Sequence, residues 1–305
     1  MVAGLVLLAG GAEALVRGAS SLARSLGLSP LVIGLTVVSI GTSLPELVVS
    51  LGAALGGSGA VALGNVVGSN ISNVALILGV SALLRAMQVQ AQVIRIDAPI
   101  LLGASVLLGL MLLDGQLSRI DGGVLMTGMI AYVWFSVRTA RSEPAAIQQE
   151  FDEGLPNRHR LWIDGALLTG GLGGLVAGAD FLVDGAVVVA TAAGLSQVVV
   201  GLTVVAVGTS LPEMATSLTA AWRGEGDIAV GNAVGSSIFN ILGILGVTVL
   251  VRPLASTALS VVDLGVMIGL AAALLPMMRS GFVLSRREGV LLLLVYVGYV
   301  AFLLL

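Results

Sequence analysis

The chain has 305 residues, of which 57% are hydrophobic and only 10% are charged. A soluble domain carries about 25% charged residues, so this composition excludes an ordinary soluble protein and predicts one that lies in a membrane. The lack of cysteine excludes disulfides, thiolate metal sites and a cysteine nucleophile, and the net charge of −3 argues against a nucleic-acid partner.

Ten apolar runs are long enough to cross a bilayer, which takes about 20 mostly apolar residues per helix. In chain order, the expected spans are residues 2–24, 30–55, 59–83, 95–113, 120–138, 161–193, 197–222, 228–250, 259–279 and 286–305. The one sizeable polar segment separates the fifth run from the sixth and is too short for a folded domain. The sequence therefore predicts an all-α integral membrane protein with ten transmembrane helices.

The second and seventh runs share a motif. GTSLPE begins at Gly41 and returns at Gly208, and with this shift of 167 residues about 29 of the 47 residues from 34 to 80 recur identically. Each half then holds five spans, and an odd number forces the second copy to enter the membrane the other way up, as in secondary transporters. We expect one five-helix repeat at 1–138, a cytoplasmic linker at 139–160 and an inverted repeat at 161–305, with ion sites at the midplane.

The arginines predict the orientation, since none of the 14 basic residues is a lysine. With the N-terminus outside the cell, only Arg119 and Arg252 fall on the outer side. The cytoplasmic side then receives Arg24, Arg85, Arg95, Arg138, Arg141, Arg158, Arg160, Arg223, Arg279, Arg286 and Arg287. Positive charge gathers on the cytoplasmic side of membrane proteins. We therefore expect a multi-pass protein of the inner (plasma) membrane with both termini extracytoplasmic.

Two glutamates lie near the middle of apolar spans. Glu46 is in the second run and Glu213 in the seventh, so both are expected near the bilayer midplane. An ionised carboxylate there costs about 3 kcal/mol unless positive charge shares the site. The middle of these runs contains no arginine, and the one histidine, His159, lies in the linker. The counter-charge must therefore come from solution, as metal ions or protons.

Oxygen-bearing side chains surround each glutamate at a spacing that places them on one helix face. These i, i+4 pairs are Thr42 with Glu46, Thr209 with Glu213, Ser69 with Asn73, and Ser236 with Asn240, and further hydroxyls come from Ser43 and Ser210. Pro45 and Pro212 each remove a backbone donor, which frees carbonyls, including those of Ser39 and Ala206, to face a cation. Oxygen ligands without His or Cys suit hard cations such as Ca²⁺ and disfavour zinc and copper.

Together, GTSLPE with GNVVGSN.SN, and GTSLPE with GNAVGSSIFN, resemble the two alpha-repeats of the sodium/calcium exchangers of the calcium/cation antiporter superfamily. The resemblance implies that Glu46 and Glu213 are the central Ca²⁺ ligands. It also implies that the other oxygens complete the Ca²⁺ and Na⁺ sites, and that spans one and six slide against the other eight. One departure is Asn240, where some prokaryotic exchangers carry Asp, so that only two acids face the centre.

The predicted function is a secondary antiporter that exchanges Na⁺ for Ca²⁺ by alternating access and normally extrudes Ca²⁺. The alternative is a Ca²⁺/H⁺ antiporter that uses the same glutamates. A cation channel could use these oxygens too, although its filter is commonly built by symmetry between subunits. An enzyme is not expected, because no span holds a nucleophile beside a histidine. No cofactor is implied, and the expected partners are the transported Ca²⁺ and Na⁺, with H⁺ in the alternative, and the lipid bilayer.

Other polar residues in the spans have less specific interpretations. Asn65 and Asn232 could contact ions or only pack helices together. For Glu13, Asp180 and Asp184 we expect hydrogen bonds between helices or a place near an ion pathway. Structural roles at helix starts are expected for two further acids, Asp97 and Asp263.

Overall fold

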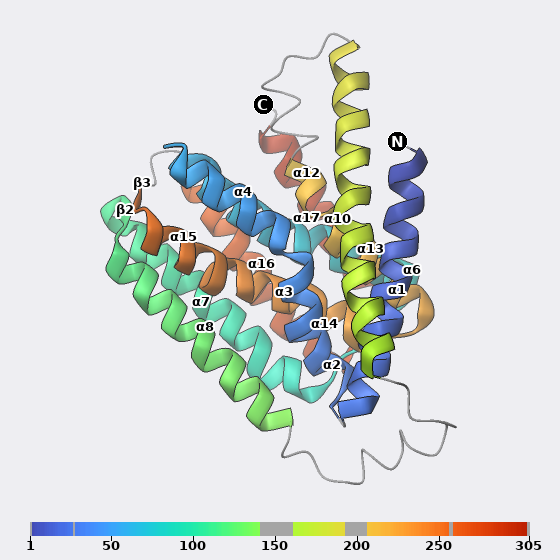
Figure 1. Cartoon of the computed structure of the whole chain (residues 1–305). Helices are drawn as coiled ribbons and strands as arrows, with labels where there is room; N and C mark the ends of the chain where they lie inside the picture. Colours follow the sequence, from blue (N-terminus) through green and yellow to red (C-terminus); the bar gives the residue numbers. More distant parts are fainter. Residues whose placement is uncertain (1, 27, 141–160, 193–205, 256–258, 304–305) are drawn as a thin grey trace.

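The computed structural model describes residues 2–26, 28–140, 161–192, 206–255 and 259–303. Within these residues the protein is almost entirely helical (Figure 1). Seven helices are long and apolar enough to cross a membrane, or eight if the bent pair Pro30–Thr42 and Leu44–Leu55 is one span. The all-helical membrane architecture is therefore confirmed, whereas the full count of ten spans stays a prediction.

The helices of the first half follow the apolar runs in chain order. They are α1 (Val2–Leu26), α2 (Pro30–Ile33), η1 (Gly34–Val38), α3 (Ser39–Thr42), α4 (Leu44–Leu55), α5 (Gly59–Ile71), η2 (Ser72–Ile77), α6 (Leu78–Leu84), η3 (Val93–Asp97), α7 (Ala98–Met111), η4 (Leu112–Asp114) and α8 (Arg119–Ala140).

The second half repeats this order where the structure describes it. Its helices are α10 (Leu161–Ala192), α12 (Ala206–Thr209), α13 (Leu211–Arg223), α14 (Gly226–Ile238), η6 (Phe239–Leu245), α15 (Gly246–Val251), α16 (Val261–Arg279) and α17 (Arg286–Leu303).

Matching serines start corresponding helices of the two halves. Before α8, the Ser118 amide donates to the Asp121 carboxylate at 2.7 Å, and before α17 the Ser285 amide donates to Glu288 at 2.7 Å. Each acid lies three residues after its serine, which is the spacing of a capping box that satisfies the free amides of a first turn. The boundary between loop and membrane helix is thus encoded locally and in duplicate.

Two short antiparallel strand pairs join the halves. β1 (Met87–Gln88) pairs with β4 (Val283–Leu284), and β2 (Gln116–Leu117) pairs with β3 (Leu254–Ala255). A shift of 167 residues carries β1 onto β3 and β2 onto β4. Each pair therefore contains one strand from each half, and the shift exchanges one pair for the other.

Three of the four π-helical segments among the described residues, η1, η2 and η6, lie within or directly before the motif regions, whereas η3 lies apart from them. η2 contains Asn73, η6 contains Asn240, and η1 ends directly before Ser39. A π-helical turn adds a residue to the helix and rotates the side chains that follow it, and such turns occur often at functional sites. Because η2 and η6 begin 167 residues apart, at Ser72 and Phe239, the irregularity belongs to the repeat.

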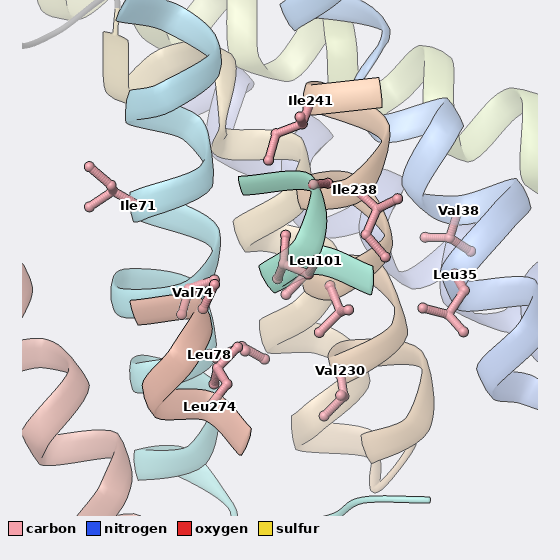
Figure 2. Packing of buried hydrophobic residues seen from close by; sticks show 14 of the residues in the cluster. Leu35, Val38, Ile71, Val74, Leu78, Leu101, Val230, Ile238, Ile241 and Leu274 are labelled. Carbon is pink, nitrogen blue, oxygen red and sulfur yellow. The ribbon is translucent and has the colours of Figure 1, made fainter. Parts of the chain in front are cut away.

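The centre of the molecule is built around α5 to α6 and α14 to α15. In the most apolar stretches of these two long helical units, 72% and 78% are buried, against 22–44% for the other candidate spans. Figure 2 shows Val74 and Leu78 of this core close to Leu274 of α16. The polar motif residues are carried by these same central elements and by the bent pair.

Glycine permits the closest approach of α14 to α2 and η1. A Cβ added at Gly231 would lie 2.9 Å from the Leu31 carbonyl oxygen, and one at Gly235 would lie 2.6 Å from the Leu35 carbonyl oxygen. These distances leave no room for any side chain, as expected for small residues at membrane helix contacts. The corresponding positions Gly64 and Gly68 meet no described atom within 4 Å, but the segment that matches α2 and η1 lies outside the described residues.

α1 and α10 lie side by side along their lengths (Figure 1), and glycines bring their backbones into contact. A Cβ at Gly11 would lie 2.7 Å from the Leu175 amide nitrogen, and one at Gly171 would lie 2.6 Å from the Leu15 amide nitrogen. Gly4 and Gly178 make the same kind of contact one to two turns away. The two helices therefore form a tightly packed pair.

We expect Gly11→Leu to destabilise the protein, because the new side chain would force the α1 and α10 backbones apart. Overpacking of this kind costs about 1–3 kcal/mol, so the melting temperature in detergent, followed by circular dichroism, should fall clearly. Gly10→Leu is the matched control, since an added Cβ at exposed Gly10 meets nothing within 4 Å. Equal melting temperatures for the two variants would contradict this packing.

Candidate functional site

Glu46 and Glu213 occupy the first turns of α4 and α13, directly after a break in each helix. Between α3 and α4 the axis bends by 44° at Ser43, and Ser210 has nearly the same backbone angles between α12 and α13. Proline is tolerated at Pro45 because the first turn of a helix does not use its backbone donors. Both glutamates are only 1% exposed. The repeated motif therefore delivers one buried carboxylate to each of two broken helices.

Each carboxylate accepts a hydrogen bond from a serine of the other half. Ser43 Oγ donates to Glu213 Oε1 at 2.8 Å, and Ser210 Oγ donates to Glu46 Oε1 at 3.4 Å. A shift of 167 residues carries Ser43 onto Ser210 and Glu46 onto Glu213. The two contacts are therefore equivalent, with the roles of the halves exchanged. The two motifs, far apart in sequence, thus meet in one buried cluster.

The second oxygen of each carboxylate has no hydrogen-bond partner among the described residues. These two atoms, Glu46 Oε2 and Glu213 Oε2, are both buried. A buried carboxylate with only one of its oxygens hydrogen-bonded is strongly disfavoured in its charged form, unless a cation or a proton neutralises it. No arginine lies between residues 30 and 84, or in α14 to α15, to supply that charge.

The amide and hydroxyl candidates on α5 to η2 and α14 to η6 lie in the same buried region. Ser69 Oγ is 3.4 Å from Ser210 Oγ, and Ser236 Oγ donates to the Ser39 carbonyl at 3.3 Å. Asn240 donates to Asn70 Oδ1 at 3.2 Å, which leaves Asn240 Oδ1 without a partner in the described chain. Neither polar atom of the Asn73 side chain has one there.

These free acceptors add neutral oxygens on η2 and η6, which pack against the glutamate helices α13 and α4. Hard cations such as Ca²⁺ and Na⁺ are held by carboxylate, amide and hydroxyl oxygens together. Among the described residues there is no group of three or more His, Cys, Asp or Glu that could hold a metal. The donor set is therefore two charges surrounded by neutral oxygens, which disfavours zinc or copper.

The threonines and backbone carbonyls of the predicted ligand set differ between the two halves in burial and in their contacts. Thr42 is fully buried and donates to Asn232 Oδ1 at 3.1 Å, whereas Thr209 is half-buried. The Ser39 carbonyl already accepts from the Ser43 amide at 3.1 Å, so the break does not free it completely. Ala206 begins α12, next to residues outside the described chain. Ligation by these groups stays a prediction.

Two serines just beyond the GTSLPE motifs received no role in the sequence interpretation. Ser50 and Ser217 each lie four residues after a motif glutamate, are fully buried, and accept hydrogen bonds from Asn65 and Asn232 at 3.0 and 2.9 Å. The i, i+4 spacing that pointed to Thr42 would have found both serines. Asn70 was also missed, because its counterpart in the second half is a serine.

The acids away from the centre have protein partners, as expected for structural roles. Asp97 accepts from the Tyr132 hydroxyl at 3.1 Å, and Asp263 accepts from the Tyr299 hydroxyl at 2.8 Å and caps α16 through Ser260.

Glu13 likewise joins two helices. It forms ion pairs with Arg17 in α1 and with Arg223 at the end of α13. Asp180 and Asp184 are exposed in α10.

Comparison with known proteins agrees with this architecture. The family model described as sodium/calcium exchanger protein matches residues 1–138 and 165–305. The putative antiporter CaxA of Alkalimonas amylolytica is 40% identical over 98% of this chain and 96% of its own. The sodium/calcium exchanger MaX1 of Methanosarcina acetivorans is 34% identical with the same coverage.

The solved structures include the sodium–calcium exchanger NCX_Mj, which superimposes with a TM-score of 0.87 at 33% identity and covers 99% of this chain and 97% of that one. Such a match over the full length, together with relatives named as exchangers and antiporters, defines a membrane transporter and not an enzyme. The chain belongs to the sodium/calcium exchanger family.

We expect Ser43→Ala to weaken Ca²⁺ binding, because it removes the hydroxyl that contacts Glu213. A hydrogen bond contributes about 0.5–1.5 kcal/mol, so the half-saturating Ca²⁺ concentration for uptake into vesicles should rise about two- to twelvefold. Ser105→Ala is the control, since Ser105 is equally buried but donates only to the Leu101 carbonyl of its own helix. An unchanged half-saturating concentration in Ser43→Ala would argue against a Ca²⁺ site at this contact.

Proposed function

We propose that this protein is an antiporter that uses inward flow of Na⁺ to extrude Ca²⁺ by alternating access. The observation that carries the proposal is the pair of buried carboxylates whose second oxygens have no partner in the described chain. The two acids share one cluster, and the one arginine of their helices, Arg223 at the end of α13, pairs with Glu13 instead. The cluster therefore needs ions from solution. Membership of the exchanger family supports Ca²⁺ and Na⁺ as those ions.

The proposed ligands are the two glutamates and the neutral oxygens around them. The neutral set comprises Thr42, Ser43, Ser69, Asn73, Thr209, Ser210, Ser236 and Asn240, with the carbonyls of Ser39 and Ala206. Two ionised glutamates carry a charge of −2, so one Ca²⁺, two Na⁺ or two H⁺ neutralise them. Three Na⁺ would leave a charge of +1. A three-for-one exchange would therefore move net charge, which is worth about 2.3 kcal/mol per 100 mV.

Coupling follows from the same charge balance. Either load can neutralise the carboxylates while they cross the low-dielectric core, but the two loads compete for the same oxygens. The unloaded site retains both negative charges, and its passage is opposed by the cost of charge inside a bilayer. The charge balance thus favours exchange of one ion load for the other over passage of the unloaded site, in either direction.

We further propose ten transmembrane helices in two inverted repeats, at residues 1–138 and 161–305. Support comes from the contacts that recur with the halves exchanged: the paired strands, the serine–glutamate contacts, and the bonds of Arg119 to the Val251 carbonyl and of Arg286 to the Leu84 carbonyl. Both termini lie at one end of the molecule, whereas α8 ends and α10 begins at the opposite end (Figure 1). An odd number of crossings per half accounts for this placement.

The proposed orientation has both termini outside the cell and the linker at 139–160 in the cytoplasm. The arginine distribution supports it, and the three tryptophans mark the position of one membrane interface without deciding which side it faces. Trp134, Trp162 and Trp222 are 60–77% exposed and lie near the ends of α8, α10 and α13 that face the cytoplasm in this orientation. Amphipathic tryptophans collect at membrane interfaces. A relative from Escherichia coli, 40% identical over 83% of this chain, is named the inner membrane protein YrbG.

Glu46→Gln and Glu213→Gln should each abolish Na⁺-dependent Ca²⁺ uptake, because a site of charge −1 cannot neutralise Ca²⁺. The measurement is ⁴⁵Ca²⁺ uptake into Na⁺-loaded vesicles that contain purified protein. Asp121→Asn is a control that removes a carboxylate from a helix cap far from the cluster in sequence. Uptake that survives in both glutamine variants would overturn the proposed function.

The coupling ion is tested by separating the two gradients. An outward Na⁺ gradient at equal pH should drive Ca²⁺ uptake, and an inside-negative voltage should slow it if three Na⁺ leave for each Ca²⁺. Uptake that ignores Na⁺ and follows a pH gradient would instead establish a Ca²⁺/H⁺ antiporter with the same paired glutamates. Conduction of about 10⁶ ions per second, a rough figure typical of a pore, would indicate a channel and overturn alternating access.

A further inference from the structure

Asn65 and Asn232 occupy corresponding positions on α5 and α14, beside the glutamate helices. We propose that they are positioning residues: each ties the glutamate turn to the neighbouring helix, and Asn232 also holds the Thr42 hydroxyl in the orientation that binds a cation. The inference rests on the proposed function, because it concerns affinity at that same site. It gives a role to two asparagines that are not themselves ligands.

Each asparagine makes the same two hydrogen bonds to the glutamate helix of its own half. Asn65 Nδ2 donates to the Glu46 backbone carbonyl at 3.3 Å and to Ser50 Oγ at 3.0 Å. In the second half, Asn232 Nδ2 donates to the Glu213 backbone carbonyl at 3.2 Å and to Ser217 Oγ at 2.9 Å. A backbone carbonyl only accepts, so each amide must present its nitrogen to the glutamate turn.

The nitrogen of each amide is therefore used by the protein. In both asparagines the nitrogen is shared between a carbonyl and a hydroxyl on the glutamate helix. The side-chain oxygen of Asn232 accepts from Thr42 Oγ1 at 3.1 Å. Asn232 is fully buried, so none of these bonds is exchanged with water. A buried network that is fully satisfied holds a helix in one position, which is what a binding carboxylate requires.

The Thr42 contact adds a specific effect on ligation. A threonine hydroxyl has one proton and two lone pairs, and only the lone pairs bind a cation. With the proton directed to Asn232 in the other half, the lone pairs are left for an ion beside Ser43 and the glutamates. Without that acceptor, the proton can turn to the Ser39 carbonyl at 3.4 Å or to the Glu213 carboxylate, and the lone pairs then turn away from the ion. Asn232 thus acts on the ion through Thr42, across the interface between the halves.

The test is a double-mutant cycle on Ca²⁺ affinity, measured as equilibrium ⁴⁵Ca²⁺ binding to the purified full-length protein without Na⁺. Asn232→Ala and Thr42→Val should each raise the Kd about tenfold. The double variant should show clearly less than the roughly hundredfold change expected for independent effects, because the part of the Asn232 effect that acts through Thr42 is lost only once. Ser237→Ala is the matched control on α14, since Ser237 donates only to the Ala233 carbonyl of its own helix. It should leave the Kd unchanged and combine additively with Thr42→Val.

A multiplicative change in the Asn232→Ala and Thr42→Val double variant would overturn the role through Thr42. An unchanged Kd in folded Asn232→Ala would overturn the positioning role altogether. If Asn232→Ala does not fold, Asn65→Ala tests the same brace in the other half, and a wild-type Kd there is the contradicting result. Wild-type protein that binds no Ca²⁺ would overturn the proposed function and this inference together, whereas wild-type binding with an unaltered variant overturns only this inference.

Discussion

The structure depends on two carboxylates placed in a protein core that supplies no positive side chain to neutralise them. Glu46 and Glu213 are buried, each accepts a serine hydroxyl from the opposite half, and each keeps one oxygen without a partner in the described chain. Charge of this kind is tolerated in a membrane only when it is functional. The broken helices, the π-helical turns and the glycine contacts all serve to bring these two groups together.

The two halves depend on each other for this cluster. A single copy of the motif provides one carboxylate and hydroxyls that point to the other copy, so neither half forms the proposed site alone. The strand pairs and the arginine contacts to helix ends also join the halves reciprocally.

The helical pair α1 and α10 differs from the rest of the fold. Its glycines bring two backbones into direct contact, so the pair is stiff internally. The remaining helices form the central body around α5 to α6 and α14 to α15, where the proposed ligands lie. The sequence resemblance to the exchanger family implied that spans one and six slide against the other eight.

The sequence by itself determined the membrane class, the helical runs, the repeated motif and the two central acids, because apolar length, duplication and a charge in an apolar run are local properties. Only the tertiary structure decided which oxygens meet. The contacts of Ser43 with Glu213 and of Thr42 with Asn232 join residues 170 and 190 positions apart. The asparagine roles stayed open in the sequence for the same reason, since an amide can donate or accept, and its neighbours across the helix contact decide which it does.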